Sequence, residues 1–131
     1  SNMSKDDGKF ETLSPPKPSS SSAVEDAIVG LRSQIGKGCN IMHAMIIGAD
    51  FYETDEQKAA IVESGGVPVG IGEGCTISNA IIDKNARIGK NCVITNASGV
   101  EELEDEENGI YIRSGIVTIL RNATIPDGTV I

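Results

Sequence analysis

The chain has 131 residues, which is room for one small domain and not for a second, catalytic one. Eleven lysines and arginines against nineteen aspartates and glutamates give a net charge of -8, which argues against nucleic acid or an anionic membrane as a partner. No apolar run approaches the roughly 18 residues that a membrane span needs. Cys39, Cys75 and Cys92 are odd in number, widely spaced and outside any CxxC motif, so the sequence predicts neither a disulfide framework nor a metal site.

The first part of the chain is rich in Ser, Pro, Lys and Asp, with Pro15, Pro16 and Pro18 followed by serines at positions 19–22. Such a composition cannot bury enough apolar surface to offset the entropy lost on ordering. It also lacks the basic and then apolar pattern of a secretory signal. We expect a disordered tail over residues 1–23 and a single domain over residues 24–131.

Beyond this tail, β-branched aliphatic residues recur with a spacing of six. Such a repeat predicts short strands that build triangular coils of about 18 residues, each rising by about 4.8 Å onto the next. One inward aliphatic per strand then aligns from coil to coil. The inward residues are expected to be Val29, Ile35, Ile41, Ile47, Ile71, Ile77, Ile82, Ile88, Ile94, Ile119, Ile125 and Ile131.

The residues between these aliphatics suit the corners of such coils. Glycine often follows the aliphatic directly, as in Ile71-Gly72, and asparagine tolerates the left-handed backbone that a tight corner needs. Small residues that fit a crowded corner lie four positions after an aliphatic, at Cys39, Cys75, Ala86, Cys92, Ala123 and Thr129. The asparagines expected at corners are Asn40, Asn79, Asn91, Asn96 and Asn122.

Two stretches interrupt the period. In the first, Thr54 and Gln57 form a capping box and Gly65 is a stop signal, which predicts a helix of about ten residues. In the second, acidic residues at 101–107 precede Asn108-Gly109 and the apolar run 110–112, which predicts a solvated loop returning into a strand. The fold class is therefore all-β, a parallel β-helix of hexapeptide repeats with one short helical insertion. We expect a left-handed β-helix, because hexapeptide-repeat proteins have that hand and the period alone does not set it.

His43 is the one candidate for acid–base chemistry in these repeats. Many hexapeptide-repeat proteins are acyltransferases with a histidine as general base, but the sequence around His43 supplies no obvious acidic partner to orient it. A carbonic anhydrase of this architecture needs three histidine ligands for zinc, and the chain has one. An acyltransferase with His43 as base is kept as the alternative function.

Several longer segments resemble the C-terminal region of ADP-glucose pyrophosphorylases (glucose-1-phosphate adenylyltransferases) of plants, algae and cyanobacteria. The resemblance spans residue 24 to the last residue, and it rests on segments 48–54, 68–72, 82–91, 111–116 and 125–131. This family makes ADP-glucose and pyrophosphate from ATP and glucose 1-phosphate, for starch or glycogen synthesis. Its chemistry, with Mg and ATP, belongs to an N-terminal domain whose motifs these residues lack. We expect no catalytic residue, no cofactor and no activity from this chain alone.

The family's β-helix domain contributes to assembly of a tetramer and to a site for anionic effectors, 3-phosphoglycerate and phosphate. The resemblance places this site at Lys84, Arg121 and Asp50. Family members of the plant catalytic type have lysine where this chain has Arg121, so the positive charge is kept while its hydrogen-bonding geometry changes. Basic residues are frequent in this part of an otherwise acidic chain, at Lys84, Arg87, Lys90, Arg113 and Arg121.

The resemblance thus predicts a regulatory and assembly module that forms homo- or hetero-oligomers with pyrophosphorylase subunits and binds small anionic effectors. A plastid is the expected location, or the cytoplasm if the source is prokaryotic. A structural remnant that assembles without binding a ligand is a further alternative. The sequence does not decide between the family's two subunit types.

Overall fold

The structure, a computed structural model, describes residues 22–131, so the expected tail lies outside the described residues up to position 21. The first strand begins at Ala23. The elements are β1 (Ala23–Glu25), β2 (Ile28–Val29), β3 (Asn40–Ile46), α1 (Asp55–Glu63), β4 (Gly70–Ile71), β5 (Thr76–Ile82), β6 (Arg87–Ile88), β7 (Val93–Ile94), β8 (Glu102–Asp105), β9 (Ile110–Arg113), β10 (Ile116–Ile119) and β11 (Thr124–Ile125).

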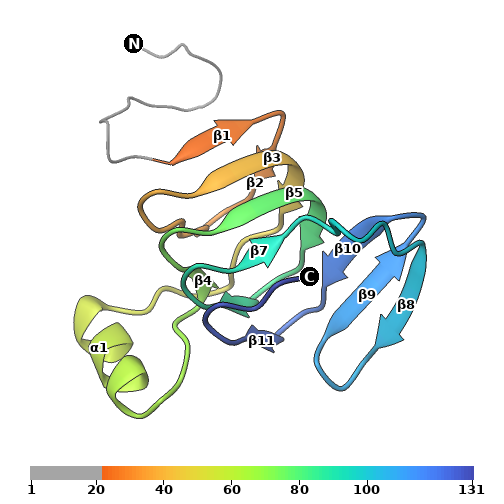
Figure 1. Cartoon of the computed structure of the whole chain (residues 1–131). Coiled ribbons are helices and arrows are strands. Elements are labelled where there is room, and N and C mark those ends of the chain that lie inside the picture. Colours follow the sequence, from red (N-terminus) through yellow and green to blue (C-terminus); the bar gives the residue numbers. More distant parts are fainter. Residues whose placement is uncertain (1–21) are drawn as a thin grey trace.

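The strands wind around three faces and stack in parallel from coil to coil (Figure 1). The first face holds β1, the first half of β3, the first half of β5, and β7. The second face holds β2, the second halves of β3 and β5, and β10. The third face holds β4, β6 and β11, and Ile35 joins β4 there through an isolated bridge. The predicted parallel β-helix is confirmed.

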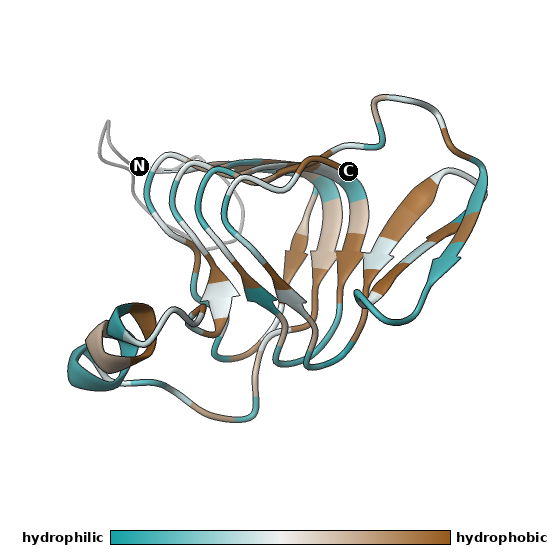
Figure 2. Cartoon of the chain, turned by 60° about the horizontal axis from the view of Figure 1, so that its bottom comes forward, coloured by the Kyte–Doolittle hydropathy of each residue, from teal (hydrophilic) through white to brown (hydrophobic). Residues whose placement is uncertain are grey.

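Columns of isoleucine fill the interior, one under each face. Under the first face, the strand register pairs Ile41 with Ile77 and Ile77 with Ile94. Under the third face, Ile71, Ile88 and Ile125 align in the same way. All of these residues belong to one buried cluster. Burial of each such side chain stabilises the fold by about 2 kcal/mol. Figure 2 shows this pattern along the chain, with hydrophobic residues on the strands and hydrophilic ones at many of the turns.

One column departs from the predicted set, because Ile46 and not Ile47 is the inward residue of the second face. Ile46 pairs with Ile82 in the parallel register and is 4 % exposed, whereas Ile47 is half-buried and outside the core cluster. The reason is the corner at His43, where a left-handed residue turns β3 from the first face to the second. The chain uses one residue fewer at this corner than at the others, so the inward position comes early.

Most predicted corner residues lie at corners. Asn79, Asn91, Asn96 and Asn122 have positive φ angles, as expected, whereas the prediction for Asn40 is wrong because it begins β3. At the corner between the third and first faces, glycine is required because successive coils stack closely there. At Gly72, for example, a Cβ atom would lie 2.7 Å from the backbone of Gly89.

The three cysteines form a column at the corner between the third and first faces. Each thiol lies 3.1 Å from a carbonyl oxygen of the next coil, those of Gly72, Gly89 and Pro126 in turn. All three are free and buried. The hydrogen bond shared with Cys39, together with burial, raises the pKa of the Cys75 thiol. The Cys39 and Cys75 thiols thus donate to the carbonyl groups of Gly72 and Gly89, whereas the Pro126 carbonyl beside Cys92 also accepts from Thr129.

Two insertions leave the coils, and the structure corrects the prediction for one of them. The capping box of Thr54 and Gln57 is present, and α1 forms as predicted. The acidic run is not a loop: β8 pairs antiparallel with β9, and β9 with β10, so a hairpin extends the sheet of the second face. Arg113 stabilises this strand because it forms ion pairs with Glu102 and Glu104.

The two ends of the β-helix differ. At the C-terminal end the hairpin buries Ile110 and Ile112 beside Val117, so the last coil is covered. At the N-terminal end Val24 and Val29 hold inward positions by register, yet each is 42 % exposed. Among residues 22–131, the N-terminal coil is therefore the uncovered end of the core.

Candidate functional site

The candidate site lies at the corner where the chain passes from the second face to the third. Main-chain hydrogen bonds stack successive coils here: the Asn85 amide donates to the Gly48 carbonyl at 3.0 Å, and the Asn122 amide donates to the Lys84 carbonyl at 3.0 Å. Lys84 and Arg121 each follow an inward isoleucine by two residues and so take equivalent positions. The repeat therefore stacks the backbones of these two cationic residues one above the other, about one strand spacing of 4.8 Å apart.

Asp50 lies on the coil above and contacts Lys84. Its carboxylate oxygen Oδ1 lies 3.2 Å from the Lys84 ammonium. Asn85 holds Asp50 at two points, because its Oδ1 accepts from the Asp50 amide at 2.9 Å and its Nδ2 donates to Oδ2 at 3.2 Å. These hydrogen bonds, from Asn85 first and then Lys84, and the positive charges of Lys84 and Arg121 lower the pKa of Asp50. The structure thus brings all three predicted site residues together.

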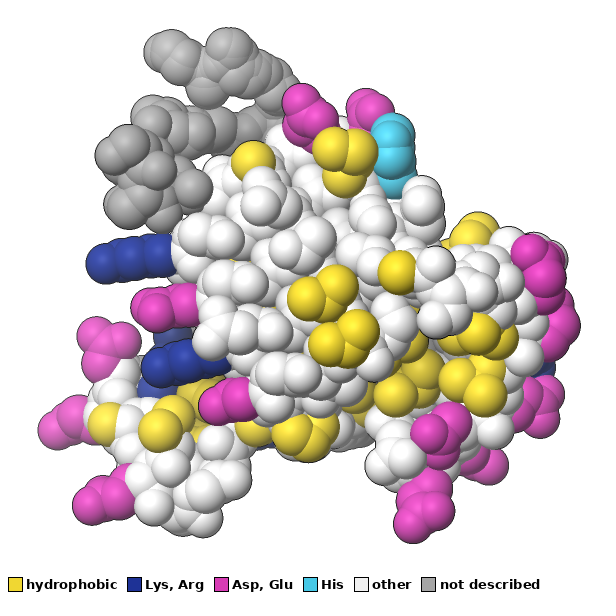
Figure 3. Space-filling view, viewed as in Figure 1, with side chains coloured by type: hydrophobic (Ala, Val, Ile, Leu, Met, Phe, Trp, Pro, Cys, Tyr) yellow, Lys and Arg dark blue, Asp and Glu magenta, His cyan; other side chains and the backbone are white. Residues whose placement is uncertain are grey.

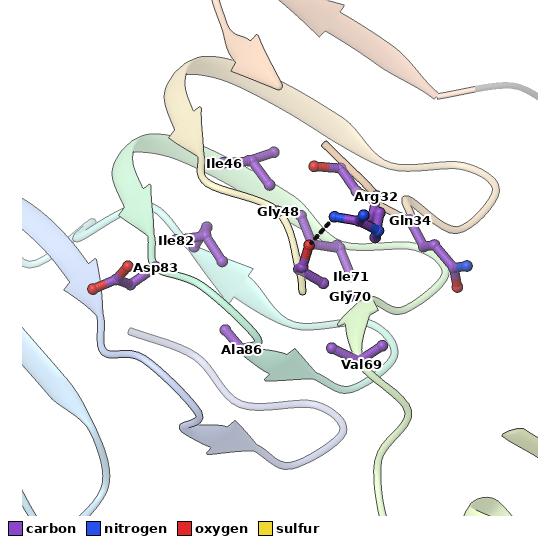
Figure 4. A pocket seen from close by; sticks show the side chains of 12 residues that line it. Arg32, Gln34, Ile46, Gly48, Val69, Gly70, Ile71, Ile82, Asp83 and Ala86 are labelled. Atoms are coloured by element: carbon purple, nitrogen blue, oxygen red, sulfur yellow. Dashed lines mark hydrogen bonds between the residues drawn. The ribbon is translucent and has the colours of Figure 1, made fainter. Parts of the chain in front are cut away.

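Sequence reasoning missed two residues of this corner. One is Asn85, whose clamp on Asp50 joins positions 35 residues apart. The other is Arg32, which lies at the same corner of the first coil, where the Ala49 amide donates to the Leu31 carbonyl at 3.0 Å. Arg32 Nη1 lies 3.4 Å from the Ala49 carbonyl oxygen, as Figure 4 shows. Arg32 directly follows the corner position of the first coil, and this place in the repeat is the sequence feature that could have identified it.

The interior behind this corner cannot hold a ligand. The cavity in Figure 4 lies between Arg32, Val69 and Ile82, and its volume is about 10 Å³. Such a space is at the lower limit for one water molecule. Any anion that Lys84 and Arg121 bind must therefore lie on the outer surface of the corner, where Arg121 is exposed and the Lys84 side chain is 34 % exposed.

The other basic residues of this part of the chain lie elsewhere. Arg87 pairs with Glu53 at 2.9 Å, and Arg113 belongs to the hairpin. The backbone amide of Lys90 donates to Asp127 at the opposite corner, between the third and first faces. The basic residues of this region thus lie at four places, and only Lys84 and Arg121 share the candidate site.

His43 has an acidic neighbour that the sequence did not reveal. Its Nδ1 lies 3.4 Å from Asp26 Oδ2, since both residues turn the first corner, on successive coils. The two side chains are 54 % and 75 % exposed, beside an open groove of about 440 Å³ over the second face. Water reaches both groups, and the open groove does not exclude water from the pair.

A family comparison decides what this β-helix is. Residues 19–130 match the family model described as the GLGC left-handed parallel β-helix domain. The chain belongs to this family. The predicted left-handed fold is thereby confirmed, and the GLGC domain accounts for nearly all of the residues that the structure describes.

A curated relative extends this assignment. The GLGC domain is 52 % identical over 108 residues to glucose-1-phosphate adenylyltransferase large subunit 1, chloroplastic/amyloplastic, of Zea mays. The match covers 82 % of this chain and 21 % of the relative, so the chain spans about a fifth of that subunit's length. The resemblance to the C-terminal part of this enzyme is confirmed. Within residues 22–131 no helix is long and apolar enough to cross a membrane.

Proposed function

We propose that this GLGC domain is a regulatory and assembly module of a glucose-1-phosphate adenylyltransferase, and that it binds phosphorylated anions at Lys84 and Arg121. The stacking of the two cations on successive coils is the observation that carries the proposal. A phosphate group can accept charge-assisted hydrogen bonds from an ammonium and a guanidinium one strand spacing apart. The effectors are small phosphorylated acids, such as 3-phosphoglycerate, and inorganic phosphate.

Asp50 acts in this site as a tethered competitor. The Asp50 carboxylate, whose pKa is lowered from an already acidic value, is ionised at neutral pH, so in the free protein it neutralises part of the charge of Lys84. A phosphate dianion carries more charge than one carboxylate and displaces it. Asp50 thus sets the affinity low enough for the site to respond to changes in effector concentration.

The enzyme's chemistry lies outside this module in the proposal. Conversion of ATP and glucose 1-phosphate to ADP-glucose and pyrophosphate, with its Mg and nucleotide, belongs to another domain of the subunit, and the chain alone is inactive. The words chloroplastic/amyloplastic in the name of the maize relative support a plastid as the location, and starch synthesis is the pathway in the proposal.

Lys84→Ala is expected to weaken phosphate and 3-phosphoglycerate binding about tenfold, because one charged hydrogen-bond donor is lost. Asp50→Asn is expected to strengthen binding about threefold, since it removes the competing charge. Both effects are measured as shifts of the melting temperature during titration with each anion. Lys37→Ala, with the same charge change at a different corner, is the control and should bind as the unaltered chain does. No shift for the unaltered chain would leave the purely structural alternative.

Assembly is proposed to use the N-terminal end of the β-helix, where the inward residues Val24 and Val29 are exposed. Strand β1 lies at one end of the sheet, and an unpaired strand edge over an apolar core favours pairing. Sedimentation of the chain should show a species larger than one 13.7 kDa protomer. Val24→Glu should return it to a monomer, whereas Val62→Glu on α1 should not. A monomer at high concentration would contradict the assembly claim.

The Asp26 contact favours the alternative acyltransferase with His43 as base. Asp26 could orient the imidazole, and the neighbouring groove is large enough for a small substrate. The exposure of both side chains outweighs this contact. The effector and assembly function therefore stands as the proposal.

A further inference from the structure

The hairpin ends in a strand whose outer edge has no neighbour within residues 22–131. Strand β8 is the last in the order β1-β3-β5-β10-β9-β8 of the larger sheet, and it pairs with β9 alone. Every second residue of such a strand points its N–H and C=O groups away from the sheet. The edge is therefore open to one more strand.

The edge is held in an extended conformation. Arg113 bridges from β9 to Glu102 at 3.5 Å and to Glu104 at 2.6 Å, and it lies over the Tyr111 ring at 5.3 Å. The Ser114 amide donates to Glu102 at 3.1 Å, and so fixes the start of β8. Little conformational entropy is left to lose on binding, so β8 is preorganised as a template.

The two sides of β8 differ in character. Leu103 and Asp105 lie opposite Ile112 and Ile110, whose side chains are buried, so this side faces the core. Leu103 is 39 % exposed, because among residues 22–131 no strand lies beyond β8. Glu102 and Glu104 alternate with them on the solvent side. A strand added here meets an apolar side chain on one side and two carboxylates on the other.

Charge decides which strand fits. Residues 101–107 include six carboxylates, at Glu101, Glu102, Glu104, Asp105, Glu106 and Glu107. Figure 3 shows acidic side chains gathered on this side of the molecule. Two copies of β8 placed side by side would repel one another, so this edge does not serve self-association. A strand with lysine or arginine at alternate positions has the complementary charge.

We infer that β8 is a docking edge for an extended basic peptide segment of a partner protein, with Lys or Arg at alternate positions and apolar residues between them. The segment adds to the sheet as one more strand. Its main chain pairs with the free edge of β8, its basic side chains lie beside Glu102 and Glu104, and an apolar side chain covers Leu103. This use of the hairpin is separate from the anion site and from the N-terminal end.

The test uses the whole chain and a labelled peptide, Lys-Val-Lys-Val-Lys-Val-Lys, followed by fluorescence anisotropy. We expect saturable binding that weakens as salt is added. Hydrogen exchange should show new protection of backbone amides in residues 101–105. The combined variant Glu102→Gln, Glu104→Gln should bind about fivefold more weakly, because it loses two cross-strand charge pairs. The combined variant Glu63→Gln, Glu73→Gln makes the same charge change elsewhere and should leave binding unchanged.

Two further peptides separate strand addition from plain charge attraction. The same peptide with N-methyl groups at alternate residues keeps its charges but loses main-chain donors, and it should bind at least tenfold more weakly. A Glu-Val alternating peptide should not bind. Equal binding of the methylated peptide, equal weakening in the two glutamate variants, or no protection in residues 101–105 would each overturn the proposal. Pairing of two β8 edges in sedimentation, abolished by Leu103→Lys, would overturn it in favour of a second copy.

Discussion

Ile46→Ala is expected to destabilise the domain by about 3 kcal/mol, and Ile47→Ala by less than about 1 kcal/mol. Ile46 belongs to the core cluster and aligns with Ile82 in the column under the second face, so truncation leaves a cavity among stacked coils. Ile47 lies beyond the end of β3 and outside this cluster. Two adjacent isoleucines thus have unequal roles, which equilibrium unfolding in urea measures directly.

The comparison has an internal control, because both variants remove the same atoms from neighbouring positions. Their m-values should match that of the unaltered chain, which shows that each variant unfolds from the same compact state. Equal losses, or a larger loss for Ile47→Ala, would mean that the inward register at the His43 corner is wrong. Binding of phosphate should be unchanged in Ile47→Ala, since Lys84 and Arg121 stay in place.

The same corner shows how far the sequence predicts this fold. A spacing of six identified ten of the inward residues as buried or half-buried, because each strand and corner repeats one geometry. At the corner between the first and second faces the inward spacing is five, as from Ile41 to Ile46 and from Ile77 to Ile82. Neighbouring isoleucines at 46 and 47 both suit a strand, so composition does not predict which of them points inward. The pairing of Ile46 with Ile82 of the next coil determines that Ile46 is the inward residue.

Non-local pairing explains the other differences. The acidic run looked like a solvated loop because carboxylates dominate it, yet Arg113, nine residues beyond Glu104, offsets two of those charges across the hairpin. The three site residues were expected to act together because of the family resemblance. Residue types and spacing alone could not predict that Asp50 lies beside Lys84 and Arg121, because only the stacking of successive coils brings these distant positions together. Asn85 was missed for the same reason.

Arg87→Met is expected to be the most destabilising change at the surface of the β-helix, at about 3 kcal/mol. The Glu53 side chain is 7 % exposed, and its two oxygens accept from Arg87 at 2.9 Å and from the Val69 amide at 2.8 Å. Removal of the guanidinium leaves a buried carboxylate with no opposite charge. Unfolding in urea gives the loss, and the double variant Glu53→Gln, Arg87→Met should recover most of it because no buried charge remains.

This ion pair also holds the helical insertion. None of the residues of α1 is buried, so core packing does not fix the helix, and a nine-residue helix is marginal by itself. Arg87 donates to the Val67 carbonyl at 2.9 Å after the helix and pairs with Glu53 before it, so one side chain ties both ends to the third coil. Arg87→Met should therefore raise amide exchange across Asp55–Glu63 well before the β-helix unfolds. Protection of α1 unchanged from the unaltered chain would show that the capping box alone maintains the helix. Loss of protection would show instead that the segment leading from Asp50 into the helix depends on Arg87 for its position beside the anion site.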